Sequence, residues 1–282
     1  MTALTLEPYL AVVRGFGDDP AEIAVHSGQF HHVLLTSTRA YRIPRTRTAA
    51  AALRQRAGIL HILSELALGV GVPVPVALVA KPDFLCLVTS RIPGEPLDPG
   101  VLADPGVLDS VADQLARVLS ALGAAAVRAA GRFPVTPPRR WHDFAEDVRA
   151  RLFPRMSPRG RARAAAELDA VVALSAVDAA LVHGDLGGEN LLWVSSADGP
   201  LLSGIVDWDE VALGDPAEDL AALMAGYGAA LGERITDRRN GSSGMLARAH
   251  VIRATFALQQ ALSAALDDDP DELADGLRDY LT

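Results

Sequence analysis

Two stretches in the second half of the chain carry residue types that suit phosphate transfer. Residues 181–190 (LVHGDLGGEN) place a carboxylate, Asp185, five positions before an amide, Asn190. A kinase catalytic loop has the same spacing between its base and a metal-binding asparagine, so one short loop can present both groups. Residues 204–209 (GIVDWD) then deliver the carboxylate of Asp207 at the end of an apolar strand. Asp185 is therefore the predicted base, and Asn190 and Asp207 are the predicted Mg²⁺ ligands, because this ion prefers carboxylate and amide oxygens.

Each stretch taken alone has an alternative interpretation, because Asp and Asn side chains often only satisfy the backbone groups of a turn. Both stretches in this order, after a strand-rich segment, favour the catalytic interpretation. Residues 214–221 (GDPAEDLA) add a helix start, with Asp215 as N-cap and Glu218 as the returning residue of a capping box. Capping does not explain Asp219. The acidic run at 267–269 is interpreted as a helix end followed by a new N-cap.

The elements that must position these residues divide the chain into a strand-rich and a helix-rich part. Short apolar stretches between turn signals predict strands, and apolar residues at helical spacing predict helices. In the first part we expect strands at residues 23–25, 33–36, 40–43, 74–79 and 84–89, and helices at 2–14 and 47–68. In the second part we expect helices at residues 107–130, 161–174, from about 216 and across 247–266, and strands at 191–194 and 201–206.

The segment IPGEP at residues 92–96 breaks regular structure and marks the expected boundary between these parts. The predicted fold class is α+β, with a β-rich N-lobe at residues 1–92 and a mainly helical C-lobe at residues 93–282. A cleft between two such lobes is a favoured place for a ligand site.

The composition excludes several classes of protein. The 282 residues carry a net charge of −9, so no basic patch for nucleic acid is expected. Cys86 is the only cysteine and lies in an apolar run, which indicates a buried, unreactive thiol and excludes an intrachain disulfide. The chain shows neither a secretory signal nor a long apolar run, so we expect a cytoplasmic protein without a membrane partner.

The strings HGDLGGEN, DWDEV and GDPAEDLAAL resemble the catalytic and supporting motifs of the aminoglycoside phosphotransferase superfamily, whose fold is similar to that of protein kinases. Longer strings, among them SGQFHHV, SRIPGEPL and TFALQQAL, resemble the viomycin and capreomycin phosphotransferases. The resemblance implies a bilobal kinase-like fold. It also implies transfer of the γ-phosphate of ATP, or of GTP, to a hydroxyl of a small cationic peptide antibiotic, with Mg²⁺ as cofactor. The phosphorylated antibiotic would no longer fit its ribosomal target, which would confer resistance.

The resemblance supports the base and the metal ligands named above and implies further roles. His183 and Asp219 would support the catalytic loop, Asp219 through hydrogen bonds to the loop backbone. Residues at the end of a predicted strand, Thr89, Ser90 and Ile92, would form the hinge that holds the adenine.

The chain departs from the kinase pattern where a lysine on the third strand usually pairs with a glutamate on the next helix. The only lysine, Lys81, lies elsewhere. Arg42 and Arg45 are the candidates to contact the phosphates; Arg42 is favoured because the string YRIPR resembles a family stretch, and solvated strand-end charges are the alternative. Gln55 or Arg56 falls where the glutamate is expected, so the ion pair is lost or another group holds the arginine.

The loop that begins at Ser27 joins the first two expected strands and is predicted to contact phosphates through its N–H groups and the Ser27 hydroxyl. His31 and His32 have no third His or Cys nearby, so we interpret them as packing or surface residues and not as metal ligands. The acids predicted to contact a cationic substrate are Glu189, Asp209 and Glu210.

Two alternatives stay open. A kinase of another small alcohol, such as an aminoglycoside, a macrolide or a metabolite, would use the same catalytic groups. A nucleotide-binding pseudokinase with a regulatory role would account for the missing lysine–glutamate pair. The sequence does not indicate the oligomeric state.

Overall fold

The computed structural model describes residues 7–27, 31–81, 84–239 and 243–282. The chain forms two compact units. The first unit consists of Met1–Leu97 together with the later segment Glu189–Asp209, and the second of Asp98–Gly188 and Glu210–Thr282. The chain therefore passes from one unit to the other three times.

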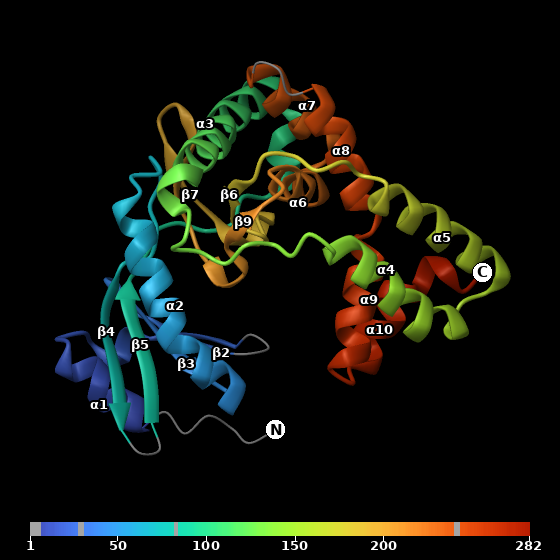
Figure 1. Ribbon diagram of the computed structural model, residues 1–282. Coiled ribbons are helices and arrows are strands. Elements are labelled where there is room, and N and C mark those ends of the chain that lie inside the picture. Colours follow the sequence, from blue (N-terminus) through green and yellow to red (C-terminus); the bar gives the residue numbers. More distant parts are fainter. Residues whose placement is uncertain (1–6, 28–30, 82–83, 240–242) are drawn as a thin grey trace. The chain divides into compact units, whose positions relative to one another are not determined.

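The first unit is built on an antiparallel sheet with strand order β1-β2-β3-β5-β4 (Figure 1). Its strands are β1 (Ala24–Ser27), β2 (His31–Leu35), β3 (Arg39–Pro44), β4 (Pro75–Lys81) and β5 (Phe84–Ser90). All five predicted strands of this region are confirmed within a few residues.

Alternation along the strands gives the sheet two different faces. Tyr41 pairs with Val88, and both are fully buried in a cluster that includes residues of helix α1 (Glu7–Gly15). Cys86 belongs to the same cluster, and burial raises the pKa of its thiol to about 12, so the predicted unreactive cysteine is confirmed as a buried one. Arg42, the neighbour of Tyr41, points to the opposite face, where it shares a partner with helix α2 (Arg47–Glu65).

Helix α2 confirms the helix predicted at 47–68 and ends slightly earlier. Thr46 is its N-cap, because its hydroxyl accepts a hydrogen bond from the N–H of Ala49 at 3.0 Å. The apolar residues Leu53, Leu60 and Leu63 follow the helical period and are buried.

A hairpin from the second half of the sequence belongs to the first unit. It comprises β7 (Leu191–Ser196) and β8 (Gly199–Ile205). Gly71 bonds to β8 through its N–H to Ser203 (3.1 Å) and through its carbonyl to Ile205 (2.9 Å). Glu95 exchanges two backbone hydrogen bonds of 3.0 and 2.9 Å with Trp193. These contacts fasten the hairpin to the two segments that flank β4 and β5.

Two glycines allow the hairpin to approach so closely. A Cβ on Gly71 would lie 2.5 Å from the carbonyl oxygen of Ser203. Gly94 has a positive φ of 109°, and a Cβ there would lie 2.5 Å from the carbonyl oxygen of Trp193. Side chains at either position would displace the hairpin, so both glycines are needed for its attachment.

The second unit is mainly helical. Its helices are α3 (Pro105–Ala129), α4 (Arg140–Arg151), α5 (Pro158–Val172), α6 (Ala217–Tyr227), α7 (Ala229–Arg238), α8 (Ser243–Ala254), α9 (Phe256–Leu266) and α10 (Pro270–Leu277). A short antiparallel ladder joins β6 (Ala180–Val182) to β9 (Ala212–Gly214), with Leu181 opposite Leu213. One core of this unit collects buried residues from α4, α5 and α9, among them Val148, Leu168 and Leu258. The predicted α+β class, with an antiparallel N-terminal sheet and a mainly helical C-terminal region, is confirmed.

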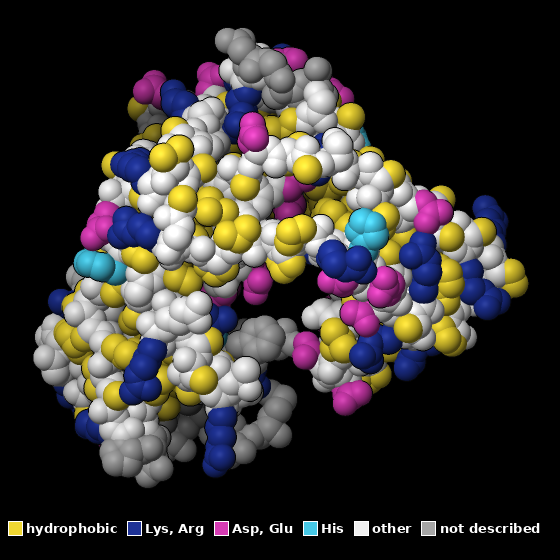
Figure 2. Space-filling model, viewed as in Figure 1, with side chains coloured by type: hydrophobic (Ala, Val, Ile, Leu, Met, Phe, Trp, Pro, Cys, Tyr) yellow, Lys and Arg dark blue, Asp and Glu magenta, His cyan; other side chains and the backbone are white. Residues whose placement is uncertain are grey.

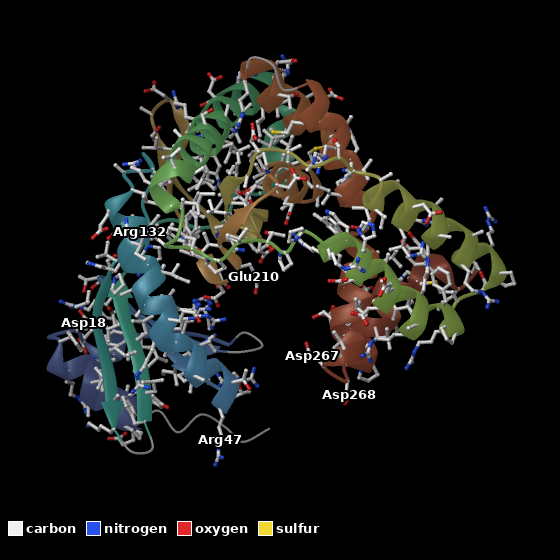
Figure 3. The ribbon with its side chains drawn as sticks, in the orientation of Figure 1. Asp18, Arg47, Arg132, Glu210, Asp267 and Asp268 are labelled. Carbon is white, nitrogen blue, oxygen red and sulfur yellow. The ribbon has the colours of Figure 1, made fainter. Side chains whose placement is uncertain are left out.

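Several boundaries in this unit follow from polar side chains. The helical region predicted at 247–266 breaks at Thr255, whose hydroxyl donates to the carbonyl of Ile252 at 2.7 Å and so competes with the helix ladder. The acidic run at 267–269 ends α9 and starts α10, as predicted, and Figure 3 labels its first two residues, Asp267 and Asp268. The carboxylate of Asp269 accepts from the N–H groups of Asp271 and Glu272. Within the described residues, no helix is both long and apolar enough to cross a membrane.

Candidate active site

Two of the predicted catalytic residues lie at the same end of the β7–β8 hairpin. Asn190 immediately precedes β7, and Asp207 follows β8 by two residues. Leu191 pairs with Ile205, and the N–H of Val206 donates to the carbonyl of Asn190 at 2.9 Å. The ladder thus brings residues 190 and 207 together although they are far apart in sequence. Asn190 is buried, and the side chain of Asp207 is 48% exposed.

The backbone of Asp207 is in an unusual conformation. Its φ is 60°, in the left-handed region that non-glycine residues rarely adopt. Such a conformation costs about 1–3 kcal/mol and is concentrated at functional sites. The sequence predicts a functional role for this residue, and the strained backbone at the end of the strand is consistent with that prediction.

The donor set at this hairpin end fits a hard divalent cation. The Asp207 carboxylate and the Asn190 amide supply oxygen ligands of the kind that Mg²⁺ accepts, and such sites leave the remaining positions to water and phosphates. The Asp207 carboxylate already attracts a cation, since the Arg42 guanidinium donates to it at 3.0 Å. Asn190 and Asp207 can therefore hold the predicted ion.

Of the two candidate arginines, Arg42 on β3 is the one that reaches the hairpin end. It contacts the carboxylates of Asp207 and Asp209. Arg45 is exposed beyond the end of β3 and acts on His32, whose pKa is lowered by burial and by this neighbouring charge.

Sequence reasoning did not assign a role to Arg56, which is part of the same group. Its Nε forms an ion pair with the Asp209 carboxylate at 3.0 Å, and its Nη1 lies 3.1 Å from the Nε2 of His31. Burial, reinforced by Arg42 and Arg56, lowers the pKa of His31 to about 3, so the imidazole is neutral and Nε2 accepts from the arginine. The sequence offered one signal for a role of Arg56, because this basic residue stands at the helix position where kinases have a glutamate.

The loop at residues 183–188, which is predicted to carry the catalytic base, lies in the second unit, and Asp219 holds its backbone. Its two carboxylate oxygens accept hydrogen bonds from the N–H groups of His183 (2.9 Å) and Gly184 (3.0 Å). The side chain predicted to support the loop backbone is thus in contact with it. His183 is fully buried, and its Nδ1 accepts from the N–H of Asp185 at 3.2 Å.

Two further constraints shape this loop. Gly184 has a φ of 87°, and a Cβ there would lie 2.6 Å from the carbonyl oxygen of Glu210, so only glycine fits. Burial raises the pKa of Asp219 to about 7, and the two N–H donors act in the opposite direction. Asp185 itself is exposed at the surface of this unit. A rigid turn therefore presents an accessible carboxylate.

The remaining predicted residues fall at the following places. Thr89 and Ser90 end β5, and the Ser90 hydroxyl accepts from the N–H of Val74 at 2.9 Å. Ile92 packs where Gly71 and Gly204 meet. Ser27 ends β1, but its side chain and the loop that follows at 28–30 lie outside the described part of the chain.

The predicted substrate acids differ in their surroundings. Glu189 and Glu210 are exposed and lie next to the two peptide bonds at which the chain leaves and re-enters the second unit. The side chain of Asp209, by contrast, is only 15% exposed and contacts two arginines.

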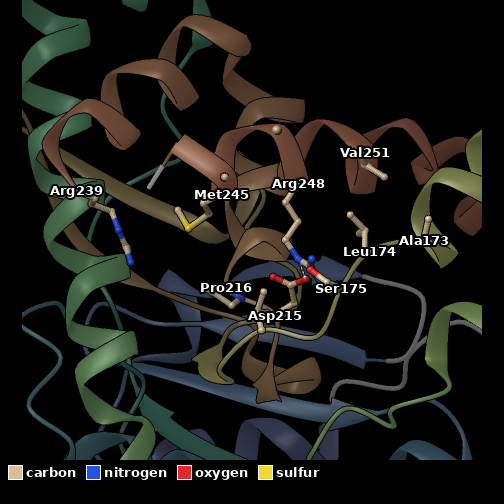
Figure 4. A pocket seen from close by; sticks show the side chains of 12 residues that line it. Ala173, Leu174, Ser175, Asp215, Pro216, Arg239, Met245, Arg248 and Val251 are labelled. Carbon is tan, nitrogen blue, oxygen red and sulfur yellow. Dashed lines mark hydrogen bonds and ion pairs between the residues drawn. The ribbon is translucent and has the colours of Figure 1, made fainter. Parts of the chain in front are cut away.

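A cavity of about 720 Å³ lies within the second unit, between the N-terminus of α6, helix α8 and the segment after α5 (Figure 4). Asp215 and Arg248 form an ion pair on its wall. None of the predicted site residues lines it. On the face shown in Figure 2, basic side chains are scattered among acidic and apolar ones and form no single continuous patch.

Comparison with known proteins gives a consistent result. The profile of the phosphotransferase enzyme family matches residues 23–270. The viomycin phosphotransferase of Streptomyces vinaceus is 48% identical over 274 residues, which are 94% of this chain and 94% of that protein.

Solved structures share the fold at lower sequence identity. Aminoglycoside 2'-phosphotransferase-IIIa in complex with GDP matches with a TM-score of 0.84 at 20% identity, over 98% of this chain and 97% of that chain. The ADP-bound aminoglycoside phosphotransferase APH(2'')-Ib matches with a TM-score of 0.77 at 15% identity, over 99% and 97%. These likenesses confirm the predicted aminoglycoside phosphotransferase fold.

Proposed function

The chain belongs to the phosphotransferase enzyme family, and from this membership we propose that it phosphorylates a hydroxyl of viomycin or of a closely related cyclic basic peptide antibiotic. The observation that carries the proposal is the 48% identity, over 94% of both chains, to a viomycin phosphotransferase. Identity at this level over nearly the whole length covers the second unit, which would contribute most of the substrate contacts. The biological result would be resistance to the antibiotic.

In the proposed reaction Asp185 accepts the proton of the attacking hydroxyl. The contacts that support this role are those of its loop, which Asp219 and Gly184 fix within the second unit. A positioned base contributes about 10²–10⁴-fold to such a reaction. The exposed acid Glu189 directly precedes Asn190, and the exposed acid Glu210 follows soon after Asp207; both are proposed to attract the cationic substrate.

The nucleotide would bind to the first unit. Asn190 and Asp207 would hold Mg²⁺, and the ion when bound would offset negative charge on the phosphates. The guanidinium of Arg42 matches phosphate geometry with two parallel N–H groups, so it can take the place of the usual lysine. The strand end at Thr89 and Ser90 is proposed to face the adenine.

The donor is proposed to be ATP, with GTP as the other candidate, because solved relatives of the same fold are complexes with ADP and with GDP. The decisive experiment incubates the purified protein with Mg²⁺ and either nucleotide. Viomycin, capreomycin, kanamycin and a macrolide are offered in parallel. Mass spectrometry should find viomycin or capreomycin heavier by one phosphate.

Two variants make the result specific. Asp185→Asn should slow formation of the product by about 10²–10⁴-fold. Asp198→Asn, which changes an exposed acid in the turn between β7 and β8, should leave the rate unchanged. Phosphorylated kanamycin or macrolide without phosphorylated viomycin or capreomycin would refute the substrate class. Nucleotide binding without any product would instead support the pseudokinase alternative.

A further inference from the structure

Two arginines from different elements share one carboxylate in the first unit. Arg42 of β3 contacts one oxygen of Asp209, and the Nε of Arg56 on α2 forms an ion pair with the other oxygen at 3.0 Å. The side chains are about equally buried, with 20%, 18% and 15% of their surfaces exposed. We call Arg42, Asp209 and Arg56 the arginine triad.

The triad brings together two guanidinium groups that would otherwise repel each other. Like charges at this separation and depth are unfavourable unless a counter-charge lies between them. Asp209 supplies that charge, one oxygen for each arginine. Both oxygens of Asp209 are thereby engaged, which argues against the predicted direct contact of this residue with the antibiotic.

The triad also inverts the arrangement expected for a kinase. There, a helix glutamate holds the basic residue of the third strand. Here the helix contributes a second cation, Arg56, and the acid comes from the segment after β8. A bound phosphate would therefore meet two planar guanidinium groups, each with five donors, in place of one ammonium.

Arg42 has a second carboxylate partner, Asp207, at 3.0 Å. The group therefore contains two guanidinium cations against the two carboxylates of Asp207 and Asp209. Asp207 is also the proposed metal ligand. A nucleotide that arrives with its divalent ion would draw on Asp207, and the two arginines would then share only Asp209. The triad itself, with two guanidinium groups and one carboxylate, carries a net positive charge that suits phosphate oxygens.

We propose that Asp209 is a positioning residue, which holds Arg42 and Arg56 side by side as a two-guanidinium site for the phosphates of the nucleoside triphosphate. The proposal rests on the proposed function only in taking the first unit as the nucleotide-binding part. His31 extends the site, because it accepts from the Nη1 of Arg56 and so limits the rotation of that side chain.

The test measures nucleotide affinity without any antibiotic. A fluorescent ATP analogue with Mg²⁺ is titrated into the wild-type protein, Asp209→Asn, Asp209→Glu and Arg56→Gln, and is displaced by ATP or by adenosine. Matched controls remove one exposed charge from the same elements: Asp198→Asn on the hairpin and Arg54→Gln on α2.

We expect Asp209→Asn and Arg56→Gln each to weaken ATP by about tenfold or more, since each breaks a largely buried charge pair. Displacement by adenosine, which has no phosphates, should change less than about twofold by the same argument. Asp209→Glu should restore part of the ATP affinity. In a double variant that combines Asp209→Asn with Arg56→Gln, the losses of ATP affinity should be clearly less than additive, because both changes disrupt one group.

Equal ATP affinity in the wild type and Asp209→Asn would overturn the proposal. An equal loss for ATP and adenosine would also overturn it, since that pattern indicates damage to the unit and not to a phosphate site. Failure of the proposed function would look different: the wild type would show the expected ATP and adenosine pattern but phosphorylate no antibiotic.

Discussion

Asp219 is the buried carboxylate that binds the backbone of the loop at His183 and Gly184, and its replacement by Asn tests the structure of that loop. The side chain is 1% exposed and accepts two backbone N–H groups, at 2.9 and 3.0 Å. An amide of the same shape has only one oxygen, so it can accept one of these N–H groups while its own NH₂ faces the other. The Asp219→Asn variant therefore keeps the packing and loses one charge-assisted hydrogen bond.

Two magnitudes follow from these contacts. Hydrogen bonds to charged groups contribute about 1.5–3 kcal/mol each, so distortion of the loop should lower turnover roughly 10- to 150-fold.

The second magnitude concerns the dependence of stability on pH. Burial raises the pKa of Asp219 from 3.8 to about 7. The folded state therefore binds this proton more tightly than the unfolded state, and the associated stability is present below pH 4 and is lost as the pH rises to about 7.

The size of that loss is roughly 4 kcal/mol, from about three pK units of difference. Urea unfolding of the wild type and of Asp219→Asn at pH values from 4 to 8 measures it directly. The free energy of unfolding of the wild type, relative to that of the variant, should decrease as the pH rises and should level off above pH 7. Asp237→Asn, an exposed acid on α7 of the same unit, serves as control and should show a pH-independent difference. Parallel pH profiles for the wild type and Asp219→Asn would refute the raised pKa.

Four further outcomes are expected. Asp18→Asn should lower the free energy of unfolding by about 2–4 kcal/mol in urea titrations, because the buried hydroxyl of Tyr41 donates to this carboxylate at 2.6 Å; an unchanged midpoint would contradict this. Gly94→Ala should lower the melting temperature, since φ is 109° there. Gly58→Ala on α2, where an added Cβ meets open space, should instead stabilise the protein by about 0.5–1 kcal/mol and raise the melting temperature. Equal shifts of the melting temperature for the two variants would contradict the role of Gly94 in attaching the hairpin. Asp185→Asn should lower kcat by about 10²–10⁴-fold in a coupled ADP-release assay with little change in nucleotide affinity, and near-normal turnover would remove it as the base.

Periodic elements were the most predictable part of the fold. Helices α2, α3 and α5 and the strands of the first sheet have apolar spacing that is visible in the sequence alone. Helix α4 was not predicted, because its sequence RWHDFAEDVRAR is mostly polar and offers only a short apolar stripe. Its Ala145 and Val148 are buried by α5 and α9, so tertiary packing and not local pattern fixes this helix.

The chemical types of the candidate site were also predictable, but not their grouping. The spacing of Asp185 and Asn190 and the strand-end position of Asp207 indicate base and metal ligands in any fold that keeps the loop. The predicted single boundary at residue 92 assigns every later residue to the second part, whereas the β7–β8 hairpin belongs to the first unit. Backbone hydrogen bonds from Gly71 and Glu95 decide this, and backbone groups carry no sequence signature.

The sequence by itself determined which residues could do chemistry, because residue type and spacing along one loop or strand are local properties. It showed that a lysine–glutamate pair is missing and left open what holds Arg42. Only the tertiary structure decided that Asp209 does so and that Arg56 joins them, because the hairpin places residue 209 beside a strand residue 167 positions earlier. That proximity depends on strand register and on the close approach of the hairpin, which Gly71 and Gly94 permit. It does not depend on the identities of Arg42, Arg56 and Asp209.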